Sequence, residues 1–301
     1  MGKHETSIYR KVIITFTVIL LGVLILVGAV VNRFCMSFIK EQRITYNTQV
    51  LGEVEYEFKE LYMQMNQLLT SLGEISYTAP LDESTFQKIK ADVEFEDSIQ
   101  NMVYLNGFNN FCEGVLFYDS EEELHYVGTG PLTKGYSFSD DEYFSGITTE
   151  MSYCAVIGPM PEQYKPEHIQ KNTVVGFSKR KMGKQVEGSL PPFVMVAVKF
   201  NKIEEMLDKL LSTNTGFFLM DQTGALLDSA SLSSLNWSDE TLNEAKKKIL
   251  KNQEHTQTIS KDGILLTSIR LNNYGWILSV ADSEEVLFKD INHLTRTVEL
   301  L

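Results

Sequence analysis

The hydrophobic and polar positions of the chain follow three successive patterns, and the first is an unbroken apolar run. Residues 12–31 (VIITFTVILLGVLILVGAVV) include no charged side chain. A helix of this length, at about 1.5 Å per residue, matches the roughly 30 Å hydrocarbon layer of a bilayer. The run is longer than the apolar core of a signal peptide, and Asn32-Arg33-Phe34 follows it in place of a small-residue cleavage site. We therefore predict an uncleaved transmembrane helix over 12–31.

Basic residues near the N-terminus set the direction of this helix. Lys3, Arg10 and Lys11 precede the apolar run, and a short basic tail normally stays on the cytoplasmic side of the membrane. The prediction is a cytoplasmic tail over 1–11 and a single-pass protein of the cell membrane whose residues 32–301 are extracytoplasmic.

The second pattern is a heptad seam. Beyond the membrane, apolar residues alternate steps of three and four at Leu51, Val54, Phe58, Leu61, Met65, Leu68, Leu72 and Ile75, and Ile44 and Asn47 extend the series toward the membrane. This 3.5-residue period predicts a stalk helix over 32–80. Two interpretations stay open: the seam pairs two chains, with Asn47 fixing their register, or the helix docks on its own domain. We expect a homodimer through the half near the membrane and docking in the half far from it.

The third pattern, a period-two alternation broken by turn residues, predicts an α+β fold with antiparallel sheets. The predicted strands are Gly114–Tyr118, Leu124–Val127, Tyr153–Ile157, Thr173–Phe177, Phe193–Phe200, Gly216–Met220, Ala225–Asp228, Gly263–Arg270 and Trp276–Ala281. The predicted helices are Ser84–Leu105, Asp141–Ile147, Lys202–Leu211, Asp239–Lys251 and a last one from Glu284 onward.

A weak internal repeat divides these elements into two modules. The strings Gly114-Val-Leu-Phe-Tyr-Asp119 and Gly216-Phe-Phe-Leu-Met-Asp221 lie 102 residues apart. Each combines a buried strand with an aspartate at its end, where the carboxylate can accept backbone N–H groups of a turn. Gly224 can supply the positive φ that the turn after Asp221 needs. The repeat predicts one strand-turn-strand core used twice.

The order of elements resembles the extracytoplasmic double Cache region of bacterial transmembrane receptors. The strings GFFLMDQTGALLDSA (216–230) and NNYGWILSVADSEEVL (272–287) look like the hairpin and the closing strand of its PAS-like modules. The resemblance implies a membrane-distal module over 81–200, a membrane-proximal module over 201–285, and an exit helix over 286–301 that leads toward a second span. SIYRKVIITF and the stalk look most like sensor histidine kinases of the YesM type; AraC-type regulators, chemoreceptors and diguanylate cyclases are alternatives.

Composition excludes several other classes. A net charge of -13 disfavours nucleic acid as a partner. The five histidines are scattered, and no HExxH or GxSxG motif occurs, so we predict no enzyme, no metal site and no cofactor in this chain. Cys112 and Cys154 are predicted near strands of one module, either as a disulfide or as two free thiols. The sequence contains no kinase or DNA-reading motif, so signalling would need a further output domain or a partner.

The resemblance implies a small-molecule pocket in the distal module, whose connections are long and rich in aromatic residues. The predicted ligand-binding residues are Tyr126, Tyr136, Tyr143, Phe144, Tyr153, Lys179 and Arg180, because aromatic faces enclose a small solute and a cation holds an anionic group. Packing of the tyrosines and solvation of the basic run are the plain alternative. Amino-acid-binding members of the family carry Arg-x-Trp-aromatic; here Asp141-Glu142-Tyr143-Phe144 has an acid instead, which favours an amine, sugar or peptide over an amino acid.

The functional hypothesis is therefore ligand sensing outside the cytoplasm. A small solute binds the distal module and a helix shift carries the signal across the membrane. The alternative is an ectodomain that binds another protein and takes no small ligand.

Overall fold

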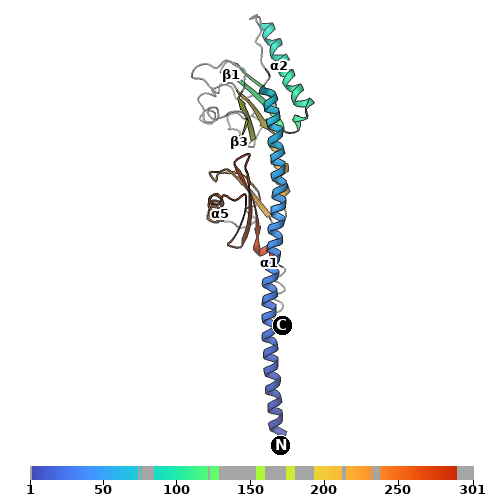
Figure 1. The fold of residues 1–301 in the computed structure, drawn as a ribbon, viewed down its shortest axis with the longest axis vertical. Helices are drawn as coiled ribbons and strands as arrows, with labels where there is room; N and C mark the ends of the chain where they lie inside the picture. The colour runs from blue at the N-terminus through green and yellow to red at the C-terminus, as the bar shows by residue number, and fades with distance from the viewer. Residues whose placement is uncertain are drawn as a thin grey trace.

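The fold is given by a computed structural model. It describes residues 2–73, 75, 85–120, 123–128, 154–159, 174–179, 193–211, 215–230, 232 and 238–289. In this part of the chain two antiparallel sheets lie one above the other along one side of a long helix (Figure 1). The predicted α+β class, with an apolar N-terminal helix, a stalk and tandem sheet modules, is confirmed.

Helix α1 (Gly2–Gly73) joins the apolar run and the stalk without a break. Its 72 residues make a rod of about 108 Å at the usual helical rise. Among the described residues it is the one helix long and apolar enough to cross a membrane. The large apolar side chains between residues 12 and 31 are at least half exposed. An apolar surface of this kind on all sides of a helix suits lipid and not water.

The distal sheet has the strand order β2-β1-β5-β4-β3. Its strands are β1 (Cys112–Ser120), β2 (Glu123–Gly128), β3 (Cys154–Pro159), β4 (Val174–Lys179) and β5 (Phe193–Val198). Helix α2 (Thr85–Leu105) and the short 3-10 helix η1 (Phe108–Asn110) precede β1. Both α1 and α2 pack on the same face of this sheet, because Phe95 of α2 meets the ring of Phe117 edge-on at 5.1 Å.

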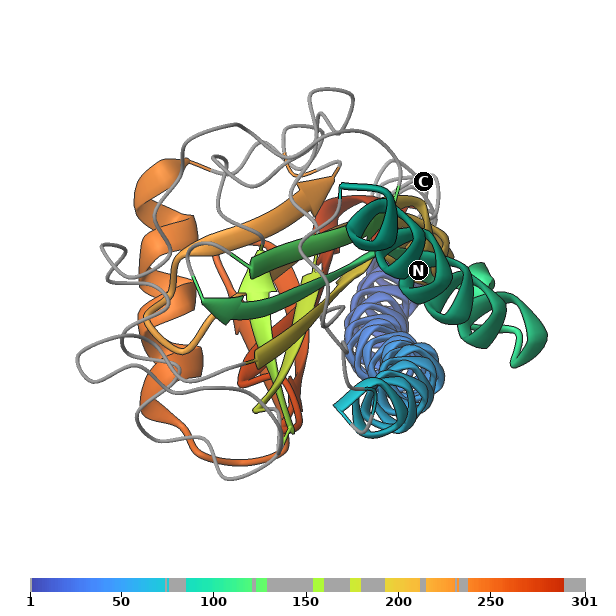
Figure 2. The same ribbon diagram turned by 90° about the horizontal axis from the view of Figure 1, so that it is seen from above.

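The proximal sheet repeats the arrangement, with the order β7-β6-β10-β9-β8. Its strands are β6 (Thr215–Met220), β7 (Leu226–Ala230), β8 (Thr256–Lys261), β9 (Ile264–Leu271) and β10 (Trp276–Ser283). Helix α4 (Phe200–Leu207) and η4 (Asp208–Leu210) lead from the distal sheet into β6. Helix α5 (Asp239–Lys251) covers the face away from α1 (Figure 2), and α6 (Glu284–Leu287) follows β10.

The internal repeat extends to the pairing register of the two sheets. Gly114 of β1 is paired with Ala197 of β5, and Gly216 of β6 is paired with Ala281 of β10. Strands β1 to β5 therefore correspond to β6 to β10, with the same order and the same register at the central pair. The predicted strand-turn-strand duplication is a duplication of whole sheets.

The turn after β6 has the geometry that the sequence predicts. The Oδ1 atom of Asp221 accepts the backbone N–H groups of Thr223 and Ala225 at 2.8 and 2.9 Å. Gly224 has a φ of 87°, and a Cβ atom there would approach Leu250 of α5 to 3.0 Å. The turn thus needs glycine both for its backbone and for its contact with the helix.

The seam of α1 is buried within its own chain. From Leu51 to Leu72 the seam residues are at most 3% exposed. They form one core with the sides of both sheets that face α1. Asn47 is 2% exposed and donates to Asp282 of its own chain, so it fixes the position of α1 on the proximal sheet rather than a register between two chains. The docked-helix interpretation therefore describes α1 from Asn47 to Leu72.

Several predicted boundaries need correction. Helix α1 is described as far as Gly73, and positions 76–80 of the predicted stalk lie outside the described residues. The linker helix begins at Phe200 and gives way to η4. Strand β8 was not predicted at all. The prediction of α5 over Asp239–Lys251 is confirmed. The predicted helix over Asp141–Ile147 lies outside the described residues, as does the exit segment beyond residue 289.

Candidate functional site

The outer face of the distal sheet, the face away from α1, is the first candidate surface. Val115 and Val196 are paired and belong to the core around α1, so the neighbouring pair Leu116 and Met195 lies on the opposite face. Leu116 and Met195 are at most 1% exposed. Beside them, the rings of Tyr118 and Phe193 stack at 5.0 Å with 18° between their planes. This face is apolar and aromatic, as a small-solute site requires.

Two of the sequence-predicted ligand residues occupy register positions of this outer face. Tyr126 of β2 is paired with Leu116, and Lys179 of β4 is paired with Phe193. Directly paired positions of antiparallel strands share one face of a sheet. The structure thus brings strands carrying Tyr126 and Lys179 into one sheet. The other five predicted positions, which are Tyr136, Tyr143, Phe144, Tyr153 and Arg180, lie outside the described residues.

The corresponding face of the proximal sheet is filled. Phe218 and Met220 pack against α5 through Ile249, and all three side chains are fully buried. Polar contacts also tie α5 to this sheet. The side chains of Gln257 and Arg270 donate to the carbonyl of Ile249 at 3.1 and 3.0 Å, respectively. The hollow beside α5 has a volume of about 20 Å³, room for about one water molecule. Within the described residues, this face leaves no space for a solute.

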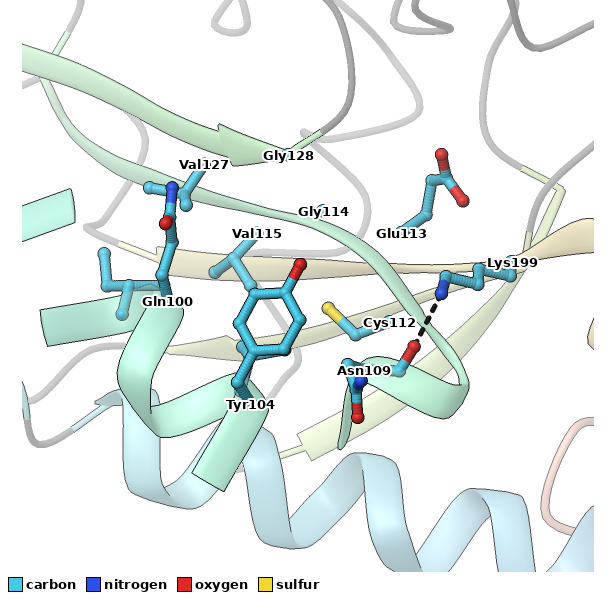
Figure 3. Close-up of a pocket in the computed structure, with 12 residues that line it drawn as sticks. Gln100, Tyr104, Asn109, Cys112, Glu113, Gly114, Val115, Val127, Gly128 and Lys199 are labelled. Carbon is cyan, nitrogen blue, oxygen red and sulfur yellow. Dashed lines mark hydrogen bonds between the residues drawn. The ribbon is translucent and has the colours of Figure 1, made fainter. Parts of the chain in front are cut away.

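A larger hollow lies on the other side of the distal sheet, between α2 and the start of β1 (Figure 3). We call it the α2 hollow, and its volume is about 270 Å³. Its floor consists of buried apolar residues and its rim of polar ones; the lining is Ile99, Gln100, Val103, Tyr104, Asn109, Cys112, Glu113, Gly114, Val115, Val127, Gly128 and Lys199. The sequence analysis did not predict it, because its lining comes from α2, η1, β1, β2 and the end of β5.

The thiol of Cys112 faces the α2 hollow in its neutral form. Cys112 is a free cysteine and 7% exposed, so the disulfide with Cys154 is not formed. Burial raises the pKa of the thiol to about 12, although the nearby charge of Lys199 lowers it. The thiol is therefore protonated at neutral pH and is a weak nucleophile.

A polar cluster ties α1 to the membrane-side end of the proximal sheet. Asp282 at the end of β10 is 3% exposed. Its Oδ1 atom accepts hydrogen bonds from Nε and from a terminal guanidinium nitrogen of Arg43, at 2.9 and 2.6 Å. Its Oδ2 atom accepts a hydrogen bond from the side-chain amide of Asn47 at 2.6 Å. Charge-assisted bonds of this kind are strong and fix geometry.

A second ion pair extends this cluster to the start of α6. Lys40 donates to Glu284 at 2.9 Å, and Ser260 donates to the same carboxylate oxygen at 2.6 Å. Burial raises the pKa of Glu284, but the hydrogen bonds from Ser260 and Lys40 outweigh it and hold the pKa below its ordinary value. We refer to Lys40, Arg43, Asn47, Ser260, Asp282 and Glu284 as the membrane-side cluster. It joins α1 to the end of β10 and the start of α6.

Comparisons with known proteins find similarity in structure only. No protein-family model and no curated protein matches the sequence. The ligand-binding domain of the Campylobacter jejuni chemoreceptor Tlp3 in complex with L-valine superposes with a TM-score of 0.56 at 10% identity, covering 84% of this chain and 98% of that one. The extracellular domain of soHK1S-Z6, named as a histidine kinase, gives 0.55 at 13% identity, over 84% and 98%.

A third similar structure is the ligand-binding domain of the Pseudomonas aeruginosa amino acid chemoreceptor PctB in complex with L-Gln. It gives a TM-score of 0.52 at 11% identity and covers 83% of this chain and 96% of that one. The TM-scores show a shared fold, and at this low identity they show the fold alone; the likeness spans nearly the whole of each sensory domain. The chain therefore has the tandem PAS-like, double Cache fold of these sensory domains, preceded by an apolar helix of membrane-spanning length.

Proposed function

We propose that this chain is the extracytoplasmic ligand-sensing region of a membrane-bound signal-transduction receptor. The observation that carries the proposal is the combination of a two-sheet sensory fold with an apolar, exposed helical segment that continues into it. Residues 32–301 would then lie outside the cytoplasm. A sensor histidine kinase of the YesM type is the preferred class of receptor, since the N-terminal and stalk sequences look most like it.

We place the ligand site on the outer face of the distal sheet. The register correspondence supports this, because α5 lies between β7 and β8, and the equivalent connection between β2 and β3 spans residues 129–153. That connection includes the predicted residues Tyr136, Tyr143 and Phe144. In the proximal sheet the space under α5 is filled, so a solute site there is disfavoured. Domain boundaries near residues 81, 201 and 285 belong to the same proposal.

A ligand screen with two matched variants tests the location of the site. A compound at hundredfold excess over its Kd should raise the unfolding midpoint of the chain in detergent micelles by about 5 °C. Ala197→Val adds bulk to the outer face and should abolish this shift, whereas Ala281→Val, at the equivalent proximal position, should keep it. Thermal unfolding is measured with amino acids, amines, sugars and short peptides.

The class of ligand follows from which group of compounds is active. The similar chemoreceptor structures contain L-valine or L-Gln, while Asp141 in this sequence favours an amine, sugar or peptide. If none of the compounds shifts the midpoint, the protein-binding ectodomain replaces small-solute sensing as the better hypothesis. If Ala197→Val and Ala281→Val both abolished the shift of the unfolding midpoint, the result would argue against a ligand site on the outer face of the distal sheet.

A homodimer through the part of α1 below Asn47 belongs to the same proposal. Phe34, Phe38 and Tyr46 are 70, 53 and 52% exposed. They lie on one row of positions spaced by four residues, in which Gln42 stands between Phe38 and Tyr46. Phe38→Glu should convert a dimer in micelles into a monomer, as measured by light scattering. Tyr56→Glu, at an exposed position outside this row, should leave the dimer intact. A monomeric parent protein would contradict the homodimer.

The membrane-side cluster supports the transmission part of the hypothesis. Because Asp282 and Glu284 are bonded to Arg43 and Lys40, a displacement of the exit from β10 acts directly on α1. We propose that α1 and the exit segment move as one body at this level, so that ligand-driven shifts of about 1–2 Å reach the membrane as a joint movement.

A further inference from the structure

The α2 hollow combines an apolar floor with one cation on its rim. Ile99 and Val115 are at most 1% exposed, and Val103 and Val127 are each 9% exposed. The ring of Tyr104, 65% exposed, stands beside the opening (Figure 3). A molecule with an apolar body can thus contact aliphatic side chains below and an aromatic ring at the side.

Lys199 is the cation at this rim. Its ammonium group donates to the backbone carbonyl of Asn109 at 2.6 Å, which uses one of its three N–H bonds (Figure 3). Within the described part of the chain Lys199 forms no ion pair. The carboxyl group of Glu113 lies on the other side of the β1 ribbon from Tyr104 (Figure 3). The bond to Asn109 leaves two N–H bonds of the ammonium group for an anion at the rim.

We propose that the α2 hollow is a second ligand site that takes a small organic carboxylate with an aryl or branched-alkyl body. The volume of about 270 Å³ equals that of about nine water molecules, which fits an acid of roughly ten non-hydrogen atoms. The carboxylate would accept from Lys199, and the body would lie between Tyr104 and the valine floor.

This site differs from the proposed sensing site in position and in effect. It lies on the α1 side of the distal sheet, whereas the sensing site lies on the outer face. Its floor residues belong to the core that α2 shares with α1. An occupant would therefore act on the packing of α2, and its binding would not depend on the outer face.

Calorimetric titration of the full chain in micelles with phenylacetate tests the proposal. Phenylacetate should bind, and neutral phenylacetamide should bind at least about tenfold more weakly, because it lacks the charge-assisted bond. Lys199→Met should weaken phenylacetate binding by a similar factor. Lys202→Met removes a partly exposed lysine from the following helix turn and should leave the affinity unchanged.

Two further variants keep the test decisive. Tyr104→Ser changes an exposed helix position, so the fold is retained, and it should weaken binding of phenylacetate several-fold through loss of the aromatic contact. Ala197→Val should leave it unchanged, which separates this site from the outer face. Absence of phenylacetate binding to the parent protein, or equal affinities in the Lys199→Met and Lys202→Met variants, would overturn the proposal.

Discussion

Arg43→Met is expected to destabilise the protein by about 3–5 kcal/mol, because it leaves the buried carboxylate of Asp282 without its cation. The side chain of Asp282 is 5% exposed, so water cannot replace the guanidinium. Asn47 would remain as a hydrogen-bond donor but carries no charge. Urea denaturation of the chain in micelles, followed by tryptophan fluorescence, measures the loss.

Two control variants distinguish the cost of leaving a buried charge unpaired from the cost of removing a side chain. Lys209→Met removes the ion pair between Lys209 and Glu57. The Lys209 side chain is 50% exposed, so the loss in stability should be less than about 1 kcal/mol. Arg43→Met combined with Asp282→Leu removes both charges and should recover much of the stability. A loss below about 1 kcal/mol for Arg43→Met alone would show that the membrane-side cluster does not hold α1.

Phe58→Ala is expected to cost about 3–5 kcal/mol, since it opens a cavity where α1 meets the proximal sheet. The ring of Phe58 is 1% exposed and meets Tyr274 and Trp276 edge-on at 5.3 and 6.2 Å. Thermal or urea unfolding measures the change. Tyr56→Ala, two positions earlier in α1 and 61% exposed, should change stability by less than about 0.5 kcal/mol.

Tyr274→Phe isolates the polar part of the same contact. The phenol of Tyr274 donates to the backbone carbonyl of Phe58 at 2.8 Å. Burial, and to a lesser degree the charge of Tyr62, raises the pKa of this phenol, so it remains a donor at neutral pH. Its removal should cost about 1 kcal/mol. If Tyr274→Phe cost as much as Phe58→Ala, the hydrogen bond and not the packing would dominate this contact.

Local signals in the sequence were sufficient for most of the fold. The apolar run and the seam predicted α1, the period-two alternation predicted nine of the strands, and the repeat predicted the two-module order, because each depends on periodic burial. Strand β8 escaped because Gln257 is its one buried residue, and that side chain is polar. A polar strand at a sheet edge has no apolar alternation by which to recognise it. The side-chain amide of Gln257 nevertheless ties β8 to α5 by a hydrogen bond to the carbonyl of Ile249.

The sites were less predictable because they depend on distant segments. Tyr126 and Lys179 could be proposed from composition, but only the register shows that they are paired with Leu116 and Phe193 of one sheet. The α2 hollow joins residues a hundred positions apart, and no local motif marks it. Asn47 illustrates the limit of a seam pattern. A polar residue between apolar neighbours fits a partner chain and a buried aspartate equally well, and the structure shows that its partner is Asp282.

Although the chain contains a duplicated sheet, its two copies share a core along α1, and a second core lies between the proximal sheet and α5. The facing sides of both sheets, together with α1 and α2, form a single apolar cluster. Removing either sheet would leave part of the apolar face of α1 uncovered, so neither copy closes this shared core alone. The two copies should consequently melt in one cooperative transition, so the repeated sheet is a unit of topology and not of stability.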